Sequence, residues 1–321
     1  MIKLGTFNLN NLFSRFNFSA SISDLNSGSA SITFSFASPD VKVKTFKGKL
    51  IKPQPPAKTN KIANRIVDAA MNVDVLAVQE VENIAILNEF NGTNLGGLYP
   101  FRVLVEGNDP RFIDVGILSK LPIGAITSFR LAEHPDAPGK EVFGRDLLEV
   151  QILSPNKKNI LFTVYNTHLK SHFGDDDDGG NGKKKNDTRR RQQAEVMQTI
   201  IGQRMQKNAR YAVVGDMNDP PNAGPLKALK KIDGQNMFNS LTNPTEIGTM
   251  KDETNPADNP TTTAWTHRFK ASGQPPEHHL FDHIWLSPRL ADKHLGSFIG
   301  RRQNLGGDGS DHDPAWVELN L

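Results

Sequence analysis

Six short segments, far apart in the chain, each carry a residue at the end of an apolar run that could bind a metal ion or act on a phosphate group. The side chains in question are Asn, Asp, Glu and His. Polar groups at the ends of buried strands can be held rigidly around one point, as a hydrolytic site requires. Oxygen donors suit a hard divalent cation and a histidine can act as a base, which together suit phosphodiester hydrolysis. The segments are residues 6–10, 78–80, 165–168, 215–218, 281–284 and 310–314.

The acidic residues of these segments are candidate metal ligands. Glu80, Asp216 and Asp311 lie at predicted strand ends or in turns, beside Gly, Asn or His. Any one of them could instead cap a turn, because Asp often hydrogen-bonds to its own backbone there. Since Mg²⁺ takes one or two carboxylates and keeps several waters, Glu80 and Asp311 with an amide oxygen from Asn8 or Asn10 would suffice.

Two histidines are candidates for proton transfer or phosphate binding. His312 lies between Asp311 and Asp313, and Asp282 is a reasonable carboxylate partner that would make it a general base. His168 follows an apolar strand and could donate a hydrogen bond to a phosphate oxygen. The alternatives are a turn histidine with an ordinary pKa and a half-buried histidine bonded to a backbone carbonyl.

Asp216 and Asn218 are two residues apart, so both side chains would face one side of an extended segment. Asp216 could then protonate or orient the leaving oxygen while Asn218 holds the phosphoryl group. A turn ahead of Pro220 and Pro221 is the alternative. We interpret the Glu-His-His sequence at residues 277–279 as a loop rather than a metal cluster.

The bulk properties restrict the class of protein. The chain has 321 residues, of which 37% are hydrophobic, and this is enough for a large core. The absence of cysteine excludes disulfides, zinc thiolate sites and cysteine nucleophiles. No run approaches the roughly 18 apolar residues of a membrane span, and the first residues carry no signal pattern. We therefore expect a monomeric cytoplasmic protein, or a secreted one if a leader has been removed.

Charge is spread unevenly along the chain. The net charge is +3, yet residues 1–65 hold ten Lys or Arg and only two Asp or Glu. A second basic cluster lies at residues 183–191. Such an arm predicts a polyanionic partner, although a solvated hairpin that aids solubility has the same composition.

The pattern of apolar residues predicts sheets covered by helices, an α/β or α+β layered domain. Helices are predicted from Thr59 or Asn60 and from Asp187 or Thr188. Residues 171–191 are otherwise interpreted as a surface loop. Because the six segments must converge, we expect one domain over residues 1–321, with a basic Ser/Lys-rich hairpin or loop inserted at about 14–57. Short apolar runs predict strands at residues 4–9, 73–78, 115–118, 147–152, 160–165, 211–214, 280–286 and 315–319.

Taken in order, these segments resemble the endonuclease/exonuclease/phosphatase (DNase I-like) superfamily, and most of all its bacterial nucleases. The resemblance runs from about Leu4 to Leu319, apart from the insertion. It rests mainly on Gln79-Glu80 and on residues 215–218 and 310–314. It implies a four-layered sandwich, two face-to-face mixed β-sheets flanked by helices. It also implies hydrolysis of a phosphate ester with Mg²⁺ or Mn²⁺, and Ca²⁺ is a further candidate.

The resemblance also implies roles for individual residues. Asn10 departs from the pattern, since abasic-site endonucleases carry an acid there, and this argues against that subfamily. The implied metal ligands are Asn8, Asn10, Glu80 and Asp311. The implied catalytic residues are His168, Asp216, Asn218, Asp282 and His312, and the implied phosphate contacts are Arg145 and Lys170.

We therefore expect a metal-dependent phosphodiesterase that acts as a nuclease on DNA or RNA. Two alternatives stay open: a phosphatase or sphingomyelinase-like enzyme acting on lipid or inositol headgroups, and a catalytically inactive module that binds phosphorylated ligands. The general base is either His312, oriented by Asp282, or Asp216.

Overall fold

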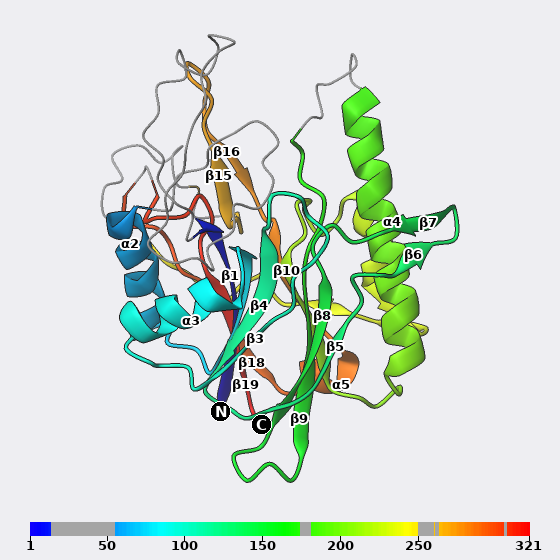
Figure 1. Cartoon of the computed structure of the whole chain (residues 1–321), viewed down its shortest axis with the longest axis horizontal. Coiled ribbons are helices and arrows are strands. Elements are labelled where there is room, and N and C mark those ends of the chain that lie inside the picture. Colours follow the sequence, from blue (N-terminus) through cyan, green and yellow to red (C-terminus); the bar gives the residue numbers. More distant parts are fainter. Residues whose placement is uncertain (14–54, 174–180, 250–259, 261–262, 305–306) are drawn as a thin grey trace, which may run out of the picture.

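Two large β-sheets pack face to face, and helices cover their outer surfaces (Figure 1). This computed structural model describes residues 1–13, 55–173, 181–249, 260, 263–304 and 307–321. Each sheet contains both parallel and antiparallel pairs. The predicted four-layered sandwich of two mixed sheets is thereby confirmed. Most of the basic insertion, at residues 14–54, lies outside the described residues.

The first sheet has seven strands in the order β14-β18-β19-β1-β2-β4-β3. Its central strand, β1 (Ile2–Leu12), runs parallel to β2 (Val75–Val81) and antiparallel to β19 (Ala315–Leu319). Helices α2 (Pro56–Val67) and α3 (Ile84–Thr93) pack on its outer face. The remaining strands are β3 (Phe101–Leu104), β4 (Asp114–Ser119), β14 (Glu246–Ile247) and β18 (His294–Ile299).

The second sheet has six strands in the order β13-β17-β10-β9-β8-β5. Here β9 (Ile160–His168) runs parallel to β10 (Tyr211–Asp216), and β17 (Asp282–Leu286) is antiparallel to β10. Helix α4 (Asn181–Arg204) and the 3₁₀ helix η2 (Gly224–Lys230) cover its outer face. The remaining strands are β5 (Ile123–Ser128), β8 (Leu147–Leu153) and β13 (Phe238–Asn239).

Smaller elements lie outside the two large sheets. They are the pairs β6 (Glu133–His134) with β7 (Ala137–Glu141), β11 (Lys231–Ile232) with β12 (Gln235–Asn236), and β15 (His267–Phe269) with β16 (Glu277–His279), and the short helix α5 (Pro288–Ala291).

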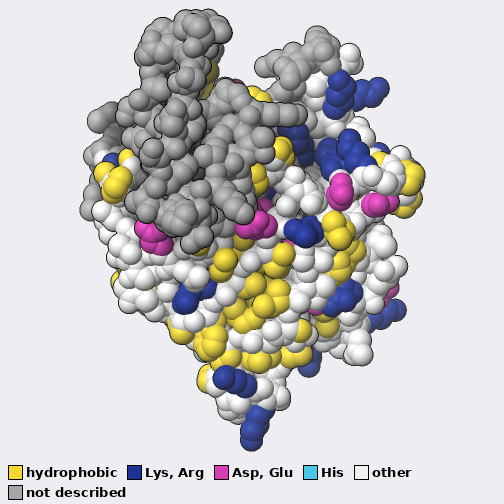
Figure 2. All heavy atoms as spheres, in the orientation of Figure 1, with side chains coloured by type: hydrophobic (Ala, Val, Ile, Leu, Met, Phe, Trp, Pro, Cys, Tyr) yellow, Lys and Arg dark blue, Asp and Glu magenta, His cyan; other side chains and the backbone are white. Residues whose placement is uncertain are grey.

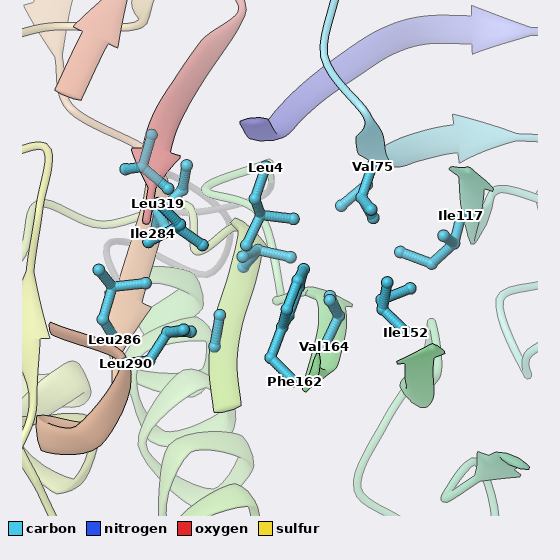
Figure 3. Close-up of a cluster of buried hydrophobic side chains, with 14 of the residues drawn as sticks. Leu4, Val75, Ile117, Ile152, Phe162, Val164, Ile284, Leu286, Leu290 and Leu319 are labelled. Carbon is cyan, nitrogen blue, oxygen red and sulfur yellow. The ribbon is translucent and has the colours of Figure 1, made fainter. Parts of the chain in front are cut away.

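The core lies between the two sheets and is made by the inward-facing side chains of their strands. Figure 3 shows Leu4, Val75 and Ile117 of the first sheet close to Phe162 and Val164 of the second. All five are fully buried, and each contributes about 1.5–3 kcal/mol relative to an exposed side chain. This packing fixes the separation of the sheets, so polar groups at their ends keep constant positions.

A buried polar contact ties the sheets together beneath the polar end of the sandwich. The Asn166 Nδ2 of β9 donates to the carbonyls of Val78 (3.1 Å) and Gly116 (2.8 Å) in the other sheet. Its Oδ1 accepts from Gln79 Nε2 at 2.8 Å. Because a buried polar group left unpaired costs about 1–3 kcal/mol, these bonds fix the two sheets in one relative register.

The helices begin earlier than the sequence pattern predicts. Helix α2 starts at Pro56 rather than Thr59, because proline is well suited to the first helical turn. The prediction of a loop up to residue 191 was wrong from Asn181 onward, where α4 begins. Asp187 pairs with Arg190, whose fully buried guanidinium also binds Asp219 at 2.7 Å. Helical ion pairs of this spacing stabilise a segment that looks wholly polar.

The prediction of a loop at residues 277–279 was also wrong. These residues form β16, which pairs with β15, and His279 lies opposite His267. None of the described helices combines the length and apolar character needed to cross a membrane.

The backbone conformation at residue 215, directly before Asp216, requires a glycine. Its φ is +130°, and a Cβ there would lie 1.9 Å from the carbonyl oxygen of Thr167 on β9. We expect Gly215→Ala to destabilise the fold by about 3 kcal/mol or more, because the β9–β10 pairing must break to make room. Thermal unfolding measures the loss. Gly202→Ala in α4 is the control, since its nearest neighbour lies 3.7 Å away, and unchanged stability of Gly215→Ala would contradict the argument.

Candidate active site

The carboxyl ends of β1, β2, β9 and β10 meet at one end of the sandwich, and side chains from both sheets come together there. Asn8 of β1 makes the link across the core. Its Nδ2 donates to Glu80 Oε1 of β2 at 3.3 Å and to Asp216 Oδ2 of β10 at 3.0 Å. Three of the six sequence segments therefore join at a single buried amide.

The backbone is irregular where these side chains leave their strands. Asn10, Glu80 and Asn218 have positive φ values of 48°, 60° and 53°. The β2–β4 register shifts between Gln79 and Val81, so Glu80 lies in a bulge. Bulges re-aim side chains, and each left-handed residue costs on the order of 1–3 kcal/mol unless its surroundings impose it. Here the Glu80 Oε2 accepts the backbone N–H of Asn11 at 3.0 Å, which holds the carboxylate in place.

Three side-chain nitrogen atoms lie near one oxygen of Asp216, and Asn8 Nδ2 donates a hydrogen bond to it. Around Oδ2 lie Asn8 Nδ2 at 3.0 Å, His168 Nε2 at 3.4 Å and His312 Nε2 at 3.6 Å. Oδ1 accepts from the backbone N–H of Asn218 at 2.9 Å. Burial raises the pKa of Asp216 to about 7, opposed by the charge of His312 and reinforced by that of Asp282. A carboxyl group that titrates near neutral pH is suited to proton transfer.

His312 and Asp282 form a buried pair, with His312 Nδ1 lying 2.7 Å from Asp282 Oδ2. Burial by itself lowers the pKa of His312, but the charges of Asp282 and Asp216 outweigh it and hold the pKa well above the ordinary value. The ring is therefore an imidazolium at neutral pH, and its Nε2 presents a proton toward Asp216.

His168 has the opposite charge state. Burial, and then the charges of Arg145 and His312, keep the pKa of His168 well below its ordinary value, so its ring is neutral. Arg145 is itself buried, with its Nε 3.2 Å from Asp109 Oδ2 and one terminal nitrogen donating to the carbonyl of Leu169. The site thus combines one charged and one neutral imidazole.

Asn218 and Lys170, which were also predicted from the sequence, differ in position. Asn218 belongs to the cluster, since its Nδ2 donates to the carbonyl of Leu169 at 3.2 Å. The Lys170 ammonium donates instead to the carbonyls of Ser171 and Phe173, at 2.8 and 3.0 Å. Lys170 also lines a surface hollow of about 640 Å³ beside α4.

The oxygen donors implied as metal ligands surround the end of β1. Asn10 Nδ2 donates to Asp311 Oδ1 at 2.8 Å, and the Asn10 carbonyl accepts from Lys58 Nζ at 3.2 Å. Burial lowers the pKa of Lys58, whereas the carboxylates of Asp311 and Glu80 act to raise it. These two carboxylates therefore already attract a positive charge here, and the donor set fits Mg²⁺ or Mn²⁺. Asn8 directs its Nδ2 at Glu80, so in this orientation it positions the carboxylate rather than offering an oxygen.

Sequence reasoning missed two residues that lie beside the site, Lys58 and His267. The His267 ring lies 4.8 Å from that of His312, and its Nε2 is 3.8 Å from Asp311 Oδ2. His267 follows Trp265, a fully buried aromatic. That tryptophan is the local sign in the sequence that a packed strand, β15, begins at His267.

Comparison with known proteins places the chain in a family. Among proteins of curated function, none is significantly similar to it in sequence. Its fold is similar to an endonuclease/exonuclease/phosphatase from Bacteroides vulgatus, at 16% identity and a TM-score of 0.60, covering 100% of this chain and 98% of that one. An AP endonuclease from Archaeoglobus fulgidus (16%, TM-score 0.57) and a mannosyl-6-phosphatase from Bacteroides thetaiotaomicron (15%, TM-score 0.54) are also similar, each over 100% of both chains.

Such low identities establish the fold alone, but the sequence itself goes further. The profile of the Endonuclease/Exonuclease/phosphatase family matches residues 5–312, nearly the whole chain. That span runs from β1 to His312 and includes every residue of the cluster described above. The chain therefore belongs to the endonuclease/exonuclease/phosphatase family.

Proposed function

We propose that this protein is a metal-dependent phosphodiesterase that hydrolyses nucleic acid. The observation that carries the proposal is the convergence of Asn8, His168 and His312 on one buried oxygen of Asp216, beside the carboxylate of Glu80. Hydrogen-bond donors gathered at a rigid point can stabilise a phosphate as its charge develops, and a carboxyl of raised pKa among them can accept a proton.

Glu80 and Asp311 would hold the divalent cation, with Asn10 beside them. When bound there, such a cation polarises a phosphoryl oxygen and offsets the charge that develops on it. Asn8 keeps Glu80 aligned toward this point. The arrangement needs only two protein carboxylates, which is typical of Mg²⁺ sites that also bind a substrate phosphate.

Asp216 is the better candidate for the base. His312 is held as an imidazolium by Asp282, so it is a poor proton acceptor and a good donor to a nonbridging phosphate oxygen. Asp216, with a pKa of about 7, can take the proton of the attacking water at neutral pH. His168, neutral and buried, supplies a second donor to the phosphate.

The choice of nucleic acid rests on surface charge, because related folds act on different esters: the AP endonuclease and the mannosyl-6-phosphatase are named for different substrates. Figure 2 shows Lys and Arg side chains gathered over the amino-terminal part of α4. A polyanionic strand gains affinity from many such contacts, which a single sugar phosphate does not need. Five basic residues line the hollow there: Lys140, Lys170, Lys184, Lys185 and Arg189.

Removing two of these charges tests whether the substrate is a nucleic acid. We expect the double variant Lys140→Gln, Lys184→Gln to raise the KM for DNA or RNA several-fold. Its KM should also depend less steeply on salt concentration, because about two phosphate contacts are lost. Hydrolysis of a small bis-aryl phosphodiester should not change. The matched control is Lys157→Gln with Lys158→Gln, in the β8–β9 loop at the opposite end of the molecule (Figure 1). Equal effects of the two pairs would mean that the basic surface at α4 is not the binding surface.

A substrate panel tests the function itself. Plasmid DNA, RNA, sphingomyelin, inositol phosphates and a bis-aryl phosphodiester should be compared with Mg²⁺, Mn²⁺, Ca²⁺ and a chelator. We expect nucleic acid to be cleaved only with metal, and His312→Gln to be nearly inactive. Hydrolysis confined to lipid or inositol headgroups would make the protein a different phosphoesterase, and no hydrolysis of any ester would make it a binding module.

A further inference from the structure

His267 is a half-buried imidazole without a hydrogen bond. Within the described part of the chain, its Nδ1 is buried and has no partner. Its Nε2 lies 3.8 Å from Asp311 Oδ2, which is beyond hydrogen-bond distance. Buried polar groups are nearly always satisfied, so the partnerless Nδ1 calls for an explanation, and Nε2 has no hydrogen bond among the described residues that would compete with a bound ion.

The surroundings of His267 supply further metal-binding atoms. His267, Asp311 and His312 each place one donor atom within 4.8 Å of the other two. The two Asp311 oxygens face different neighbours, Oδ1 toward Asn10 at 2.8 Å and Oδ2 toward His267. The Asp311 carboxylate can therefore belong to the oxygen-donor site on one side and to an imidazole site on the other.

The distances suit a small tetrahedral ion after a modest adjustment. Ligand atoms around Zn²⁺ lie about 3.3 Å apart, given metal–ligand distances near 2.0–2.1 Å. His267 and Asp311, 3.8 Å apart, must close by roughly 0.5 Å to reach that separation, and the widest pair, at up to 4.8 Å, by roughly 1.5 Å. The Asp311 side chain is 53% exposed, so it can move. Two imidazoles with one carboxylate favour Zn²⁺ and similar transition metals, whereas Mg²⁺ prefers oxygen ligands.

We propose that His267, Asp311 and His312 form a binding site for a transition-metal ion such as Zn²⁺, and that filling it inhibits the enzyme. The ion would displace a proton from the His312 imidazolium, and it would draw His312 away from the phosphate and Asp311 away from the catalytic cation. His267 lies beside His312 and Asp311 but, in the described contacts, makes no hydrogen bond to either side chain and is assigned no step of the reaction, so its loss should spare catalysis supported by Mg²⁺. The binding part of this proposal stands on geometry alone, and the inhibition part rests on the proposed function.

Direct binding is the first test. We expect isothermal titration in excess Mg²⁺ to show one tight Zn²⁺ site in the wild type. His267→Gln should weaken that site by at least about tenfold, the scale seen when a metal site loses a supporting residue. His294→Gln is the control, because His294 lies on β18 and bonds to Ser297 Oγ at 2.6 Å. Equal Zn²⁺ affinity in the wild type and in His267→Gln would overturn the site, provided that thermal unfolding shows both proteins folded.

Inhibition is the second test, measured on nucleic acid with Mg²⁺ and increasing Zn²⁺. The Zn²⁺ concentration for half inhibition should rise at least about tenfold in His267→Gln, with activity in the absence of Zn²⁺ close to that of the wild type. Zn²⁺ that binds through His267 without inhibiting would overturn the inhibitory role. Zn²⁺ bound through His267 in a protein that cleaves no ester would support the metal site and refute the proposed function instead.

Discussion

Replacing Glu80 with glutamine is expected to reduce phosphodiester hydrolysis by roughly a thousandfold, because stabilisation by the catalytic cation is worth several kcal/mol. Glutamine keeps the shape of the side chain and an oxygen that can accept the Asn11 N–H, so the fold should persist. What is lost is the negative charge that would hold the cation. The measurement is initial rate against Mg²⁺ concentration, and we expect half-saturation at a much higher concentration in the variant, with partial recovery at high Mg²⁺.

Glu82→Gln is the matched control for Glu80→Gln. It removes the same charge two residues further along, beyond the end of β2. Its Mg²⁺ dependence should match that of the wild type. If Glu80→Gln also showed a wild-type half-saturation concentration, Glu80 would not be a metal ligand, whatever its effect on rate.

Asp216→Asn is expected to lower the rate by about a hundredfold to ten-thousandfold, the usual range for a positioned general base. The pH profile gives the sharper test. Because burial raises the pKa of Asp216 to about 7, the group is mostly protonated at pH 5 and ionised at pH 8. If the ionised form is the base, the wild-type rate rises with pH up to about 7 and is flat above it, whereas Asp216→Asn shows no such rise.

His312→Gln separates the two candidate bases. The charge of His312 lowers the pKa of Asp216, so removing it should move the rising limb of the pH profile to higher pH without abolishing it. A rising limb that disappears in His312→Gln and survives in Asp216→Asn would make His312 the base.

Stability against pH shows whether Asp216→Asn is folded. The folded-state pKa of Asp216 lies above the ordinary value of 3.8. The stability that this group contributes is therefore fully present below about pH 4 and is lost as pH rises through 7. The asparagine variant lacks this loss, so it should unfold at a higher temperature than the wild type at pH 8. Lost activity with raised stability would exclude unfolding as the cause.

The strands that position the site could be predicted from the sequence because their pattern is local. Short apolar runs marked β8, β10 and β19, and the residues at the end of each run, among them Asp216, were candidates for that reason. The position of Asp282 in an apolar segment suggested it as the partner of His312, the family resemblance implied the same pair, and His312 Nδ1 lies 2.7 Å from Asp282 Oδ2. The roles of these residues in catalysis stay predictions until the variants are measured.

Other features depend on contacts that leave no local pattern. Helix α4 is anchored by Arg190, which is buried against Asp219, 29 residues away, and a run of charged residues conceals that burial. His267 reaches the site only because β15 pairs with β16 and brings its ring against His312.

By itself the sequence determined the central strands of both sheets, the family, and the residues from which a metal-dependent hydrolase is proposed, since these follow from local periodicity and motifs. Tertiary structure alone decided the charge states and the convergence. Asn8 meets Asp216 across 208 residues of chain. Burial raises the pKa of Asp216, whereas the pKa of His312 rises against the effect of burial, because two carboxylates share one buried space with its imidazole. Burial and the distances between these side chains set their charge states, and neither can be read from the order of the amino acids.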